Sequence, residues 1–190
     1  MTRTHTTTTH LPTDMLERFS SRAEKLDLDN TYFEEDLAEL RSVGYLAAAV
    51  PSHLGGWGFD LATLAASQRR LARYAPATAL AMTMHSYWVG IATELERAGD
   101  PSLRWMLEAA VTGDVFAAGH AERGNDIPVL LSTCAAERVD GGYRLTGRKQ
   151  FGSNGPAWRW LGAHAIDAAA PGGPRVVHAF VERTLSLIHI

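Results

Sequence analysis

The sequence predicts an α+β protein, in which an all-α helical bundle precedes the first part of an antiparallel β domain. Two observations carry this prediction. Apolar residues recur at helical spacing through residues 11–113, and residues 114–184 contain short β-branched or alternating runs separated by glycine turns. Helices followed by strands, without alternation, are typical of α+β folds rather than of doubly wound sheets. We therefore place a domain boundary near Asp114, and a disordered polar tail over residues 1–10.

The first two helices are expected to begin at capping residues. Asp14 can cap a helix over residues 13–26, because Glu17 follows it at the spacing of a capping box. Thr31 and Glu34 repeat that spacing, and they predict the start of a second helix.

Three further helices are expected over residues 61–73, 77–97 and 100–113. The last of them has Asp100 as its cap and Gly113 as its end. The longest carries an apolar stripe at helical spacing that should face a core, formed by Leu80, Met84, Trp88, Ile91 and Leu95. Five helices in succession predict a small bundle.

The strands are expected after Gly113. Phe116 opens a short run that resembles a buried strand, and Asp140-Gly141 lies between two short runs as in a β-hairpin. Residues 176–182 form a further strand on their β-branched and aromatic content.

Composition excludes several classes of partner. The net charge of -3 gives no general attraction to nucleic acid or to anionic membranes, and no segment has the apolar length of a membrane span. A single cysteine, Cys134, cannot form an internal disulfide, which is typical of a reducing compartment. We therefore expect a cytoplasmic protein with a small-molecule partner.

Familiar catalytic and metal motifs are missing from the sequence. It has no G-x-G-x-x-G after a strand, no P-loop and no G-x-S-x-G elbow. His164 and Asp167 have a spacing that two metal ligands can use, but no third ligand accompanies them, so no metal site is expected. His85, on the fourth helix, is interpreted as a hydrogen-bonded structural histidine rather than a ligand.

The stretch "FAAGHAERGND", residues 116–126, has an unusually bare backbone. Small side chains leave peptide N–H and C=O groups open to a partner, and glycine permits a close approach. Taken alone, the stretch fits either a tight turn or a ligand loop.

Three motifs in order decide between these readings. Residues 50–58, "VPSHLGGWG", resemble a Val-Pro followed by a Gly-Gly-x-Gly turn. Residues 116–126 take the place of the motif Y-C-x-T-E-P-x-A-G-S-D. Residues 140–155, "DGGYRLTGRKQFGSNG", resemble G-x-Y-x-L-x-G-x-K-x-W-I-T-N-G. Together they resemble the acyl-CoA dehydrogenase family.

The resemblance implies a fold and an activity for a longer parent protein. A helical domain and a β domain would be followed by a C-terminal helical bundle that this chain lacks, so the chain is a fragment. The parent would use FAD to catalyse α,β-dehydrogenation of an acyl-CoA in fatty acid metabolism, would pass electrons to a flavoprotein acceptor, and would form a homo-oligomer. The family's catalytic glutamate lies in the missing bundle. No catalytic residue is therefore assigned, and the chain alone is expected to bind FAD weakly and to be inactive.

The resemblance also implies site residues. Ala118 and Gly119 would offer main-chain groups to the flavin, Phe151 would flank its ring, and Ser153 would supply a hydroxyl. Asn125 would contact the substrate thioester. The full flavin-binding set implied is Phe116, Ala117, Ala118, Gly119, Gly124, Phe151, Gly152 and Ser153. Because both segments must touch one ring, Gly119, Phe151 and Ser153 are expected to share one face of the β domain.

The chain departs from the family at the centre of this site. Gly119 replaces a threonine, and His120 and Ala121 replace a Glu-Pro pair. These changes keep open a flavin-dependent monooxygenase of the same fold, and a non-catalytic helical interaction module remains a third alternative.

The last six residues, Leu185–Ile190, have a different origin in our interpretation. "LSLIHI" is the translation of a transposase adapter used in library preparation, CTGTCTCTTATACACATC. We expect this segment to be a non-native tail.

Overall fold

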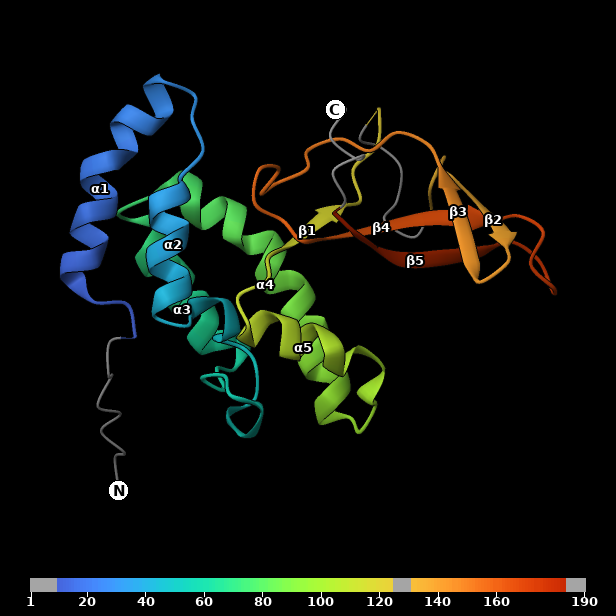
Figure 1. The fold of residues 1–190 in the computed structure, drawn as a ribbon, viewed down its shortest axis with the longest axis horizontal. Helices are drawn as coiled ribbons and strands as arrows, with labels where there is room; N and C mark the ends of the chain where they lie inside the picture. The colour runs from blue at the N-terminus through green and yellow to red at the C-terminus, as the bar shows by residue number, and fades with distance from the viewer. Residues whose placement is uncertain (1–9, 125–130, 184–190) are drawn as a thin grey trace. The chain divides into compact units, whose positions relative to one another are not determined.

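The computed structural model describes residues 10–124 and 131–183 (Figure 1). The chain forms two compact units, Met1–Gly113 and Asp114–Ile190. The first unit is helical and the second holds a sheet, which confirms the α+β prediction. None of the helices in these described ranges is long and apolar enough to cross a membrane. The predicted tail, Leu185–Ile190, lies outside them.

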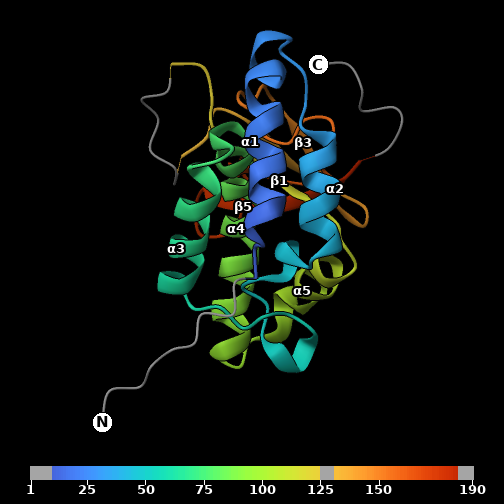
Figure 2. The same ribbon diagram turned by 90° about the vertical axis from the view of Figure 1, so that its left-hand side faces the viewer.

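The helical unit contains the expected five α-helices and three short 3-10 turns. The α-helices are α1 (Thr13–Leu28), α2 (Glu34–Ser42), α3 (Leu61–Ala72), α4 (Pro76–Arg97) and α5 (Arg104–Val111). The 3-10 turns are η1 (Tyr45–Ala47), η2 (Ser52–Leu54) and η3 (Pro101–Leu103). Helices α1 and α2 lie side by side (Figures 1 and 2), and Arg18 of α1 forms an ion pair with Glu39 of α2 at 2.5 Å.

Two of the predicted caps are wrong. Helix α1 begins at Thr13 after Pro12, with no capping side chain, and Asp14 instead accepts a hydrogen bond from Arg18 at 3.1 Å. Helix α2 begins at Glu34 itself, so the Thr31–Glu34 box does not form, and three acidic residues in the first turn offset the helix dipole instead. Asp100 does act as a cap, because its carboxylate accepts from Ser102 N at 2.9 Å, but it caps the 3-10 turn η3, and α5 itself begins at Arg104 without a capping side chain.

The apolar stripe predicted for α4 is also largely wrong. Leu80 is 72% exposed, and of the five predicted residues only Trp88 is buried. The buried face is Thr78, Ala79, Met82, His85, Trp88, Val89, Ala92 and Thr93. The predicted stripe was chosen from the large apolar side chains of the helix. The face that the helix buries also contains small residues, which permit close packing.

The Gly-Gly turn of residues 50–58 closes back on η1. Gly58 N donates to Val50 O at 2.8 Å and Phe59 N donates to Ala48 O at 2.9 Å. A Cβ at Gly56 would lie 2.2 Å from Val50 O, so no larger residue fits there. The motif therefore has a structural explanation within the helical unit.

The second unit is a five-stranded sheet. Its strands are β1 (Phe116–Gly119), β2 (Ala135–Val139), β3 (Gly142–Thr146), β4 (Trp160–Asp167) and β5 (Arg175–Glu182). The predicted hairpin is β2–β3, and Gly141 at its turn has φ 77°. The predicted strand over residues 176–182 is β5. Strand β4 was not expected from the sequence.

Strand β4 organises the sheet. It pairs antiparallel with β5 along its whole length, from Trp160 opposite Glu182 to Asp167 opposite Arg175. On its other edge it pairs parallel with β1, and further along, at Ile166, with β2. The antiparallel pairs β2–β3 and β4–β5 are therefore joined by parallel pairing between β2 and β4. The prediction of an antiparallel domain did not include this parallel pairing.

Candidate functional site

The candidate site lies where the chain leaves the edge of β4 and returns to it. Strand β1 ends at Gly119, opposite Ala163, and β2 starts at Ala135, opposite Ile166. The chain therefore leaves the edge of β4 after Gly119 and pairs with it again at Ala135, three positions further along β4. Strand β1 therefore pairs with the first part of β4 and β2 with its end (Figure 1).

A second segment joins the first at one backbone hydrogen bond. Gln150 N donates to Ala121 O at 2.8 Å, which brings the "KQFGSNG" segment against the end of β1. We call residues 118–121 together with 151–153 the rim. Phe151 in the rim is 75% exposed and has φ 55°, a conformation that costs a non-glycine residue on the order of 1 kcal/mol. Such strain concentrates at functional sites.

The structure brings the two predicted segments together, but their side chains differ in solvent exposure. Phe116, Ala117, Ala118 and Gly119 are buried in β1, so the side chain of Phe116 belongs to the core. Gly124, Phe151 and Gly152 are exposed and Ser153 is half-buried. Asn125 lies outside the described residues. The convergence of Gly119, Phe151 and Ser153 on one face stays a prediction.

Directly behind the rim lies a buried carboxylate that sequence reasoning missed. Glu122 is 4% exposed. It accepts hydrogen bonds from Lys149 Nζ at 2.5 Å, from Thr133 N at 2.7 Å, from Thr133 Oγ1 at 2.5 Å and from the hydroxyl of Ser132. Burial alone would raise the pKa of Glu122, but these donors outweigh it and hold the pKa well below its usual range. The carboxylate is therefore ionised.

Lys149 also fixes the state of a buried histidine. Its Nζ lies 3.4 Å from His164 Nδ1, and His164 Nε2 lies 2.9 Å from Leu131 O. A carbonyl only accepts and an ammonium only donates, so Nε2 carries the proton and Nδ1 accepts. This assigns the neutral Nε2–H tautomer to His164.

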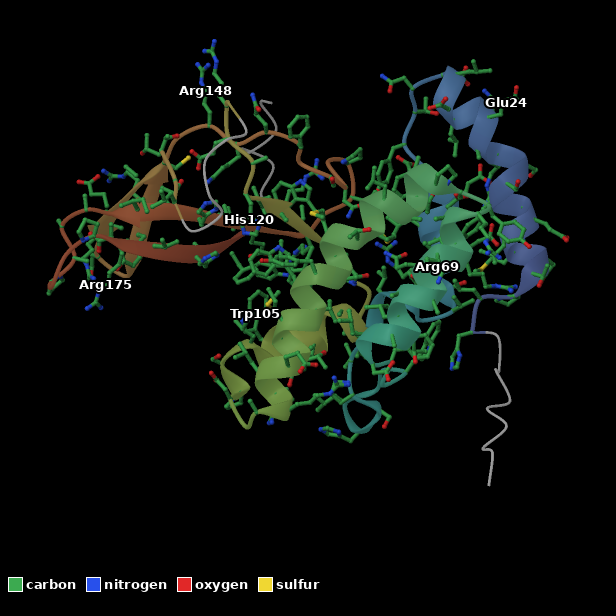
Figure 3. All side chains as sticks on the ribbon, turned by 180° about the vertical axis from the view of Figure 1, so that it is seen from behind. Glu24, Arg69, Trp105, His120, Arg148 and Arg175 are labelled. Atoms are coloured by element: carbon green, nitrogen blue, oxygen red, sulfur yellow. The ribbon has the colours of Figure 1, made fainter. Side chains whose placement is uncertain are left out.

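Two more imidazoles surround His164. The ring centroids of His120 and His178 lie 5.1 Å and 5.7 Å from that of His164, and 5.9 Å from each other. His120 lies beside the end of β1 (Figure 3). Burial, followed by the fields of the other two histidines and of Lys149, lowers the pKa of His120 to about 4. The imidazole that replaces the family's glutamate is therefore neutral at physiological pH.

Other histidine interpretations can now be compared with the structure. His85 Nε2 lies 2.8 Å from Leu46 O in the helical core, as expected of a structural histidine. His164 and Asp167 have separate partners, because Asp167 pairs with Arg138 at 2.9 Å. Across the described ranges, no three His, Cys, Asp or Glu side chains form a group that could hold a metal.

The comparisons with known proteins agree with the motifs. The acyl-CoA dehydrogenase N-terminal domain matches residues 13–113, more than half of the chain. The chain belongs to the acyl-CoA dehydrogenase family. Among curated members and relatives, isovaleryl-CoA dehydrogenase of Solanum tuberosum is 26% identical over 175 residues, covering 90% of this chain and 42% of that protein. Dibenzothiophene monooxygenase of Mycolicibacterium goodii is 28% identical over 120 residues, covering 63% of this chain and 28% of that protein.

Solved structures of similar fold include flavin-bound proteins. KijD3 in complex with FMN and an amino-keto sugar nucleotide is 28% identical, with a TM-score of 0.78, covering 90% of this chain and 42% of that one. A nitrososynthase from Micromonospora carbonacea var. africana is 25% identical, with a TM-score of 0.79, covering 96% of this chain and 47% of that one. The chain thus spans less than half the length of these relatives.

These findings support a flavin cofactor and an oxidoreductase. The rim of this acyl-CoA dehydrogenase family member carries the kinds of groups that contact a flat aromatic ring. It combines bare backbone at Gly119, an exposed aromatic side chain at Phe151 and a hydroxyl at Ser153.

Proposed function

We propose that the chain is the N-terminal part of a flavin-dependent oxidoreductase that holds its flavin against the rim. The hydrogen bond from Gln150 N to Ala121 O carries the proposal, because it joins the two segments that the family resemblance assigns to one ring. A bound flavin would supply the electron transfer. Main-chain groups of Ala118 and Gly119 would orient it, Phe151 would shield it from water, and Ser153 would donate a hydrogen bond.

Of the two chemistries open to this fold, we propose oxygen-dependent oxidation of an organic substrate by reduced flavin. Oxygen chemistry at a reduced flavin needs a proton. His120 places a neutral imidazole where the family has a carboxylate, and Gly119 lacks the side chain of the family's threonine. The similarity to a dibenzothiophene monooxygenase and to an FMN-bound sugar-nucleotide enzyme supports this choice.

The second candidate is α,β-dehydrogenation of an acyl-CoA, with FAD as the flavin and electrons passing to a flavoprotein acceptor. It is supported by the similarity to isovaleryl-CoA dehydrogenase, which extends over most of the chain. In this case Asn125 would contact the thioester, and the base would come from residues beyond this chain. A homo-oligomer is expected under either candidate.

Anaerobic mixing separates the two candidates. The protein carrying its complete C-terminal part is loaded with FAD or FMN and mixed with a panel of acyl-CoA thioesters without oxygen. Our proposal expects the flavin to stay oxidised. It also expects that the chemically reduced protein, exposed to labelled oxygen with dibenzothiophene or an amino-sugar nucleotide, transfers one labelled oxygen atom to a substrate. Bleaching by any acyl-CoA would favour dehydrogenation, and failure to bind either flavin would overturn both candidates.

A further inference from the structure

The buried Glu122–Lys149 pair adjoins both halves of the rim. Glu122 directly follows Ala121 and Lys149 directly precedes Gln150, so each is the chain neighbour of one partner in the joining hydrogen bond. A Cβ built on Gly119 would lie 3.6 Å from Lys149 Cγ. The pair is therefore in contact with the backbone on which the proposed flavin would lie.

The same carboxylate connects Glu122 to Ser132 and Thr133, which precede β2. Its hydrogen bonds with Ser132 and Thr133 join the residues just before β2 to the residue shortly after β1, and Ser132 Oγ also lies 3.3 Å from His164 O. The hydrogen bonds of Glu122 thus link the end of β1, the entry to β2, the segment after β3 and strand β4.

We propose that Glu122 and Lys149 are a positioning pair that fixes the rim and balances charge behind it, and so sets the reduction potential of the flavin. This inference rests on the proposed flavin site. Removing one partner leaves the other as an uncompensated buried charge. An unpaired ammonium would stabilise the electron-rich reduced flavin, whereas an unpaired carboxylate would destabilise it.

Reduction potentials of the flavin-loaded protein test the inference. Glu122→Gln should raise the reduction potential and Lys149→Met should lower it. Each shift should correspond to a change on the order of tenfold in the ratio of the affinities for reduced and oxidised flavin. The double variant should return toward the wild-type value. Arg144→Met is the matched control, because Arg144 forms an exposed ion pair with Glu137 on the β2–β3 hairpin, and it should change nothing. Single variants that shift the potential in the same direction would overturn the inference.

Histidine titration in the flavin-free protein gives an independent readout. The groups that face His120 are His164 of β4, His178 of β5 and Lys149 after β3. Burial is the main cause that lowers the pKa of His120 and of His178, and the charge of Lys149 lowers both further. Lys149→Met should therefore raise both pKa values, as measured by NMR, whereas a merely structural role would leave them in place. If the wild type binds no flavin, the proposed function fails while this titration still tests the pair.

A conservative variant covers the case in which neither single variant folds. Glu122→Asp keeps the charge and lengthens the contact to Lys149, so the potential should stay near the wild-type value while flavin affinity falls. Unchanged flavin affinity in Glu122→Asp would overturn the positioning role.

Discussion

Asp36 in the helical unit and Glu122 in the β unit are both buried carboxylates that meet a cation, yet their surroundings differ. Asp36 is 1% exposed and accepts from Arg22 Nε at 2.9 Å and from Thr78 Oγ1 at 2.9 Å. Its partners belong to α1 and α4, which are regular helices. Glu122 instead binds irregular backbone and lies beside imidazoles.

The cations differ as well. Arg22 also binds Glu39 at 2.8 Å and Glu35 at 3.3 Å, so it has other acidic partners. Lys149 has Glu122 as its only acidic partner among the described residues, beside Ser132 and His164. The Asp36–Arg22 pair therefore connects regular helices, whereas the Glu122–Lys149 pair connects irregular segments next to the rim.

The largest expected effect is loss of the Glu122 carboxylate. Glu122→Gln should lower the free energy of unfolding by about 3–5 kcal/mol, because Lys149 stays buried without a counter-charge. Asp36→Asn should cost only about 1 kcal/mol, since Arg22 keeps Glu39. Urea titration of the two variants checks this order. Equal losses would show that the two pairs serve the same role.

The next effect is the acid response of the buried histidine in the helical unit. Burial, the largest contribution, lowers the pKa of His85 from 6.5 to about 4. Because the unfolded chain binds this proton more readily, the contribution to stability is complete above pH 6.5 and declines as the pH falls to about 4, by roughly 3 kcal/mol in all.

Glu122 responds at lower pH. Its pKa is held below the usual glutamate value of 4.5, so its contribution to stability is complete above pH 4.5 and is lost only as the pH falls further. Hydrogen exchange should thus show helix α4 losing protection as the pH falls from 6.5 to about 4. His120 in the β unit has its pKa lowered to about 4 as well, mainly by burial, so the comparison is made on α4 between wild type and His85→Gln. His85→Gln should abolish the loss in α4, and an unchanged pH response in that variant would contradict the assignment.

The contrast between the units also shows what local sequence can predict. The β2–β3 hairpin follows from its glycine turn and the start of the fifth helical segment from Asp100, and the expected helix over residues 61–73 differs from α3 by one residue. Strand β4 was missed because "WLGAHAID" interrupts its apolar run with Gly162, His164 and Asp167. These residues are buried only because β1, β2 and β5 surround them.

The candidate site divides in the same way. The motifs identify the two segments of the rim, since each is a continuous stretch of sequence. They do not identify the Glu122–Lys149 pair, because an ion pair between separate segments depends on the sheet that brings them together. The acidic residue also lies two positions after the family's glutamate, where the motif allows any residue.

A smaller effect is expected when the family's threonine is restored at the rim. A Cβ at Gly119 would lie 3.3 Å from Leu161 Cδ1, so Gly119→Thr needs only a small shift of that side chain. Its hydroxyl should tighten flavin binding by roughly 0.5–1.5 kcal/mol. Fluorescence titration of the protein with its complete C-terminal part checks this, with Gly119→Ala as the control. If the two variants bind flavin equally, no flavin atom lies within reach of the hydroxyl.

The smallest effects compare one glycine in each unit. A Cβ meets nothing within 4 Å at Gly90 in α4 or at Gly152 in the rim, and neither has a positive φ. Gly90→Ala should stabilise the protein by about 0.5–1 kcal/mol through helix propensity, and Gly152→Ala by about 0.4–1 kcal/mol through the unfolded chain. Only Gly152→Ala should also weaken flavin binding, because its methyl group would be added to the rim itself. Thermal unfolding with and without flavin separates the two outcomes: a flavin-induced rise in Tm that is equal in both variants would move the cofactor away from residues 151–153.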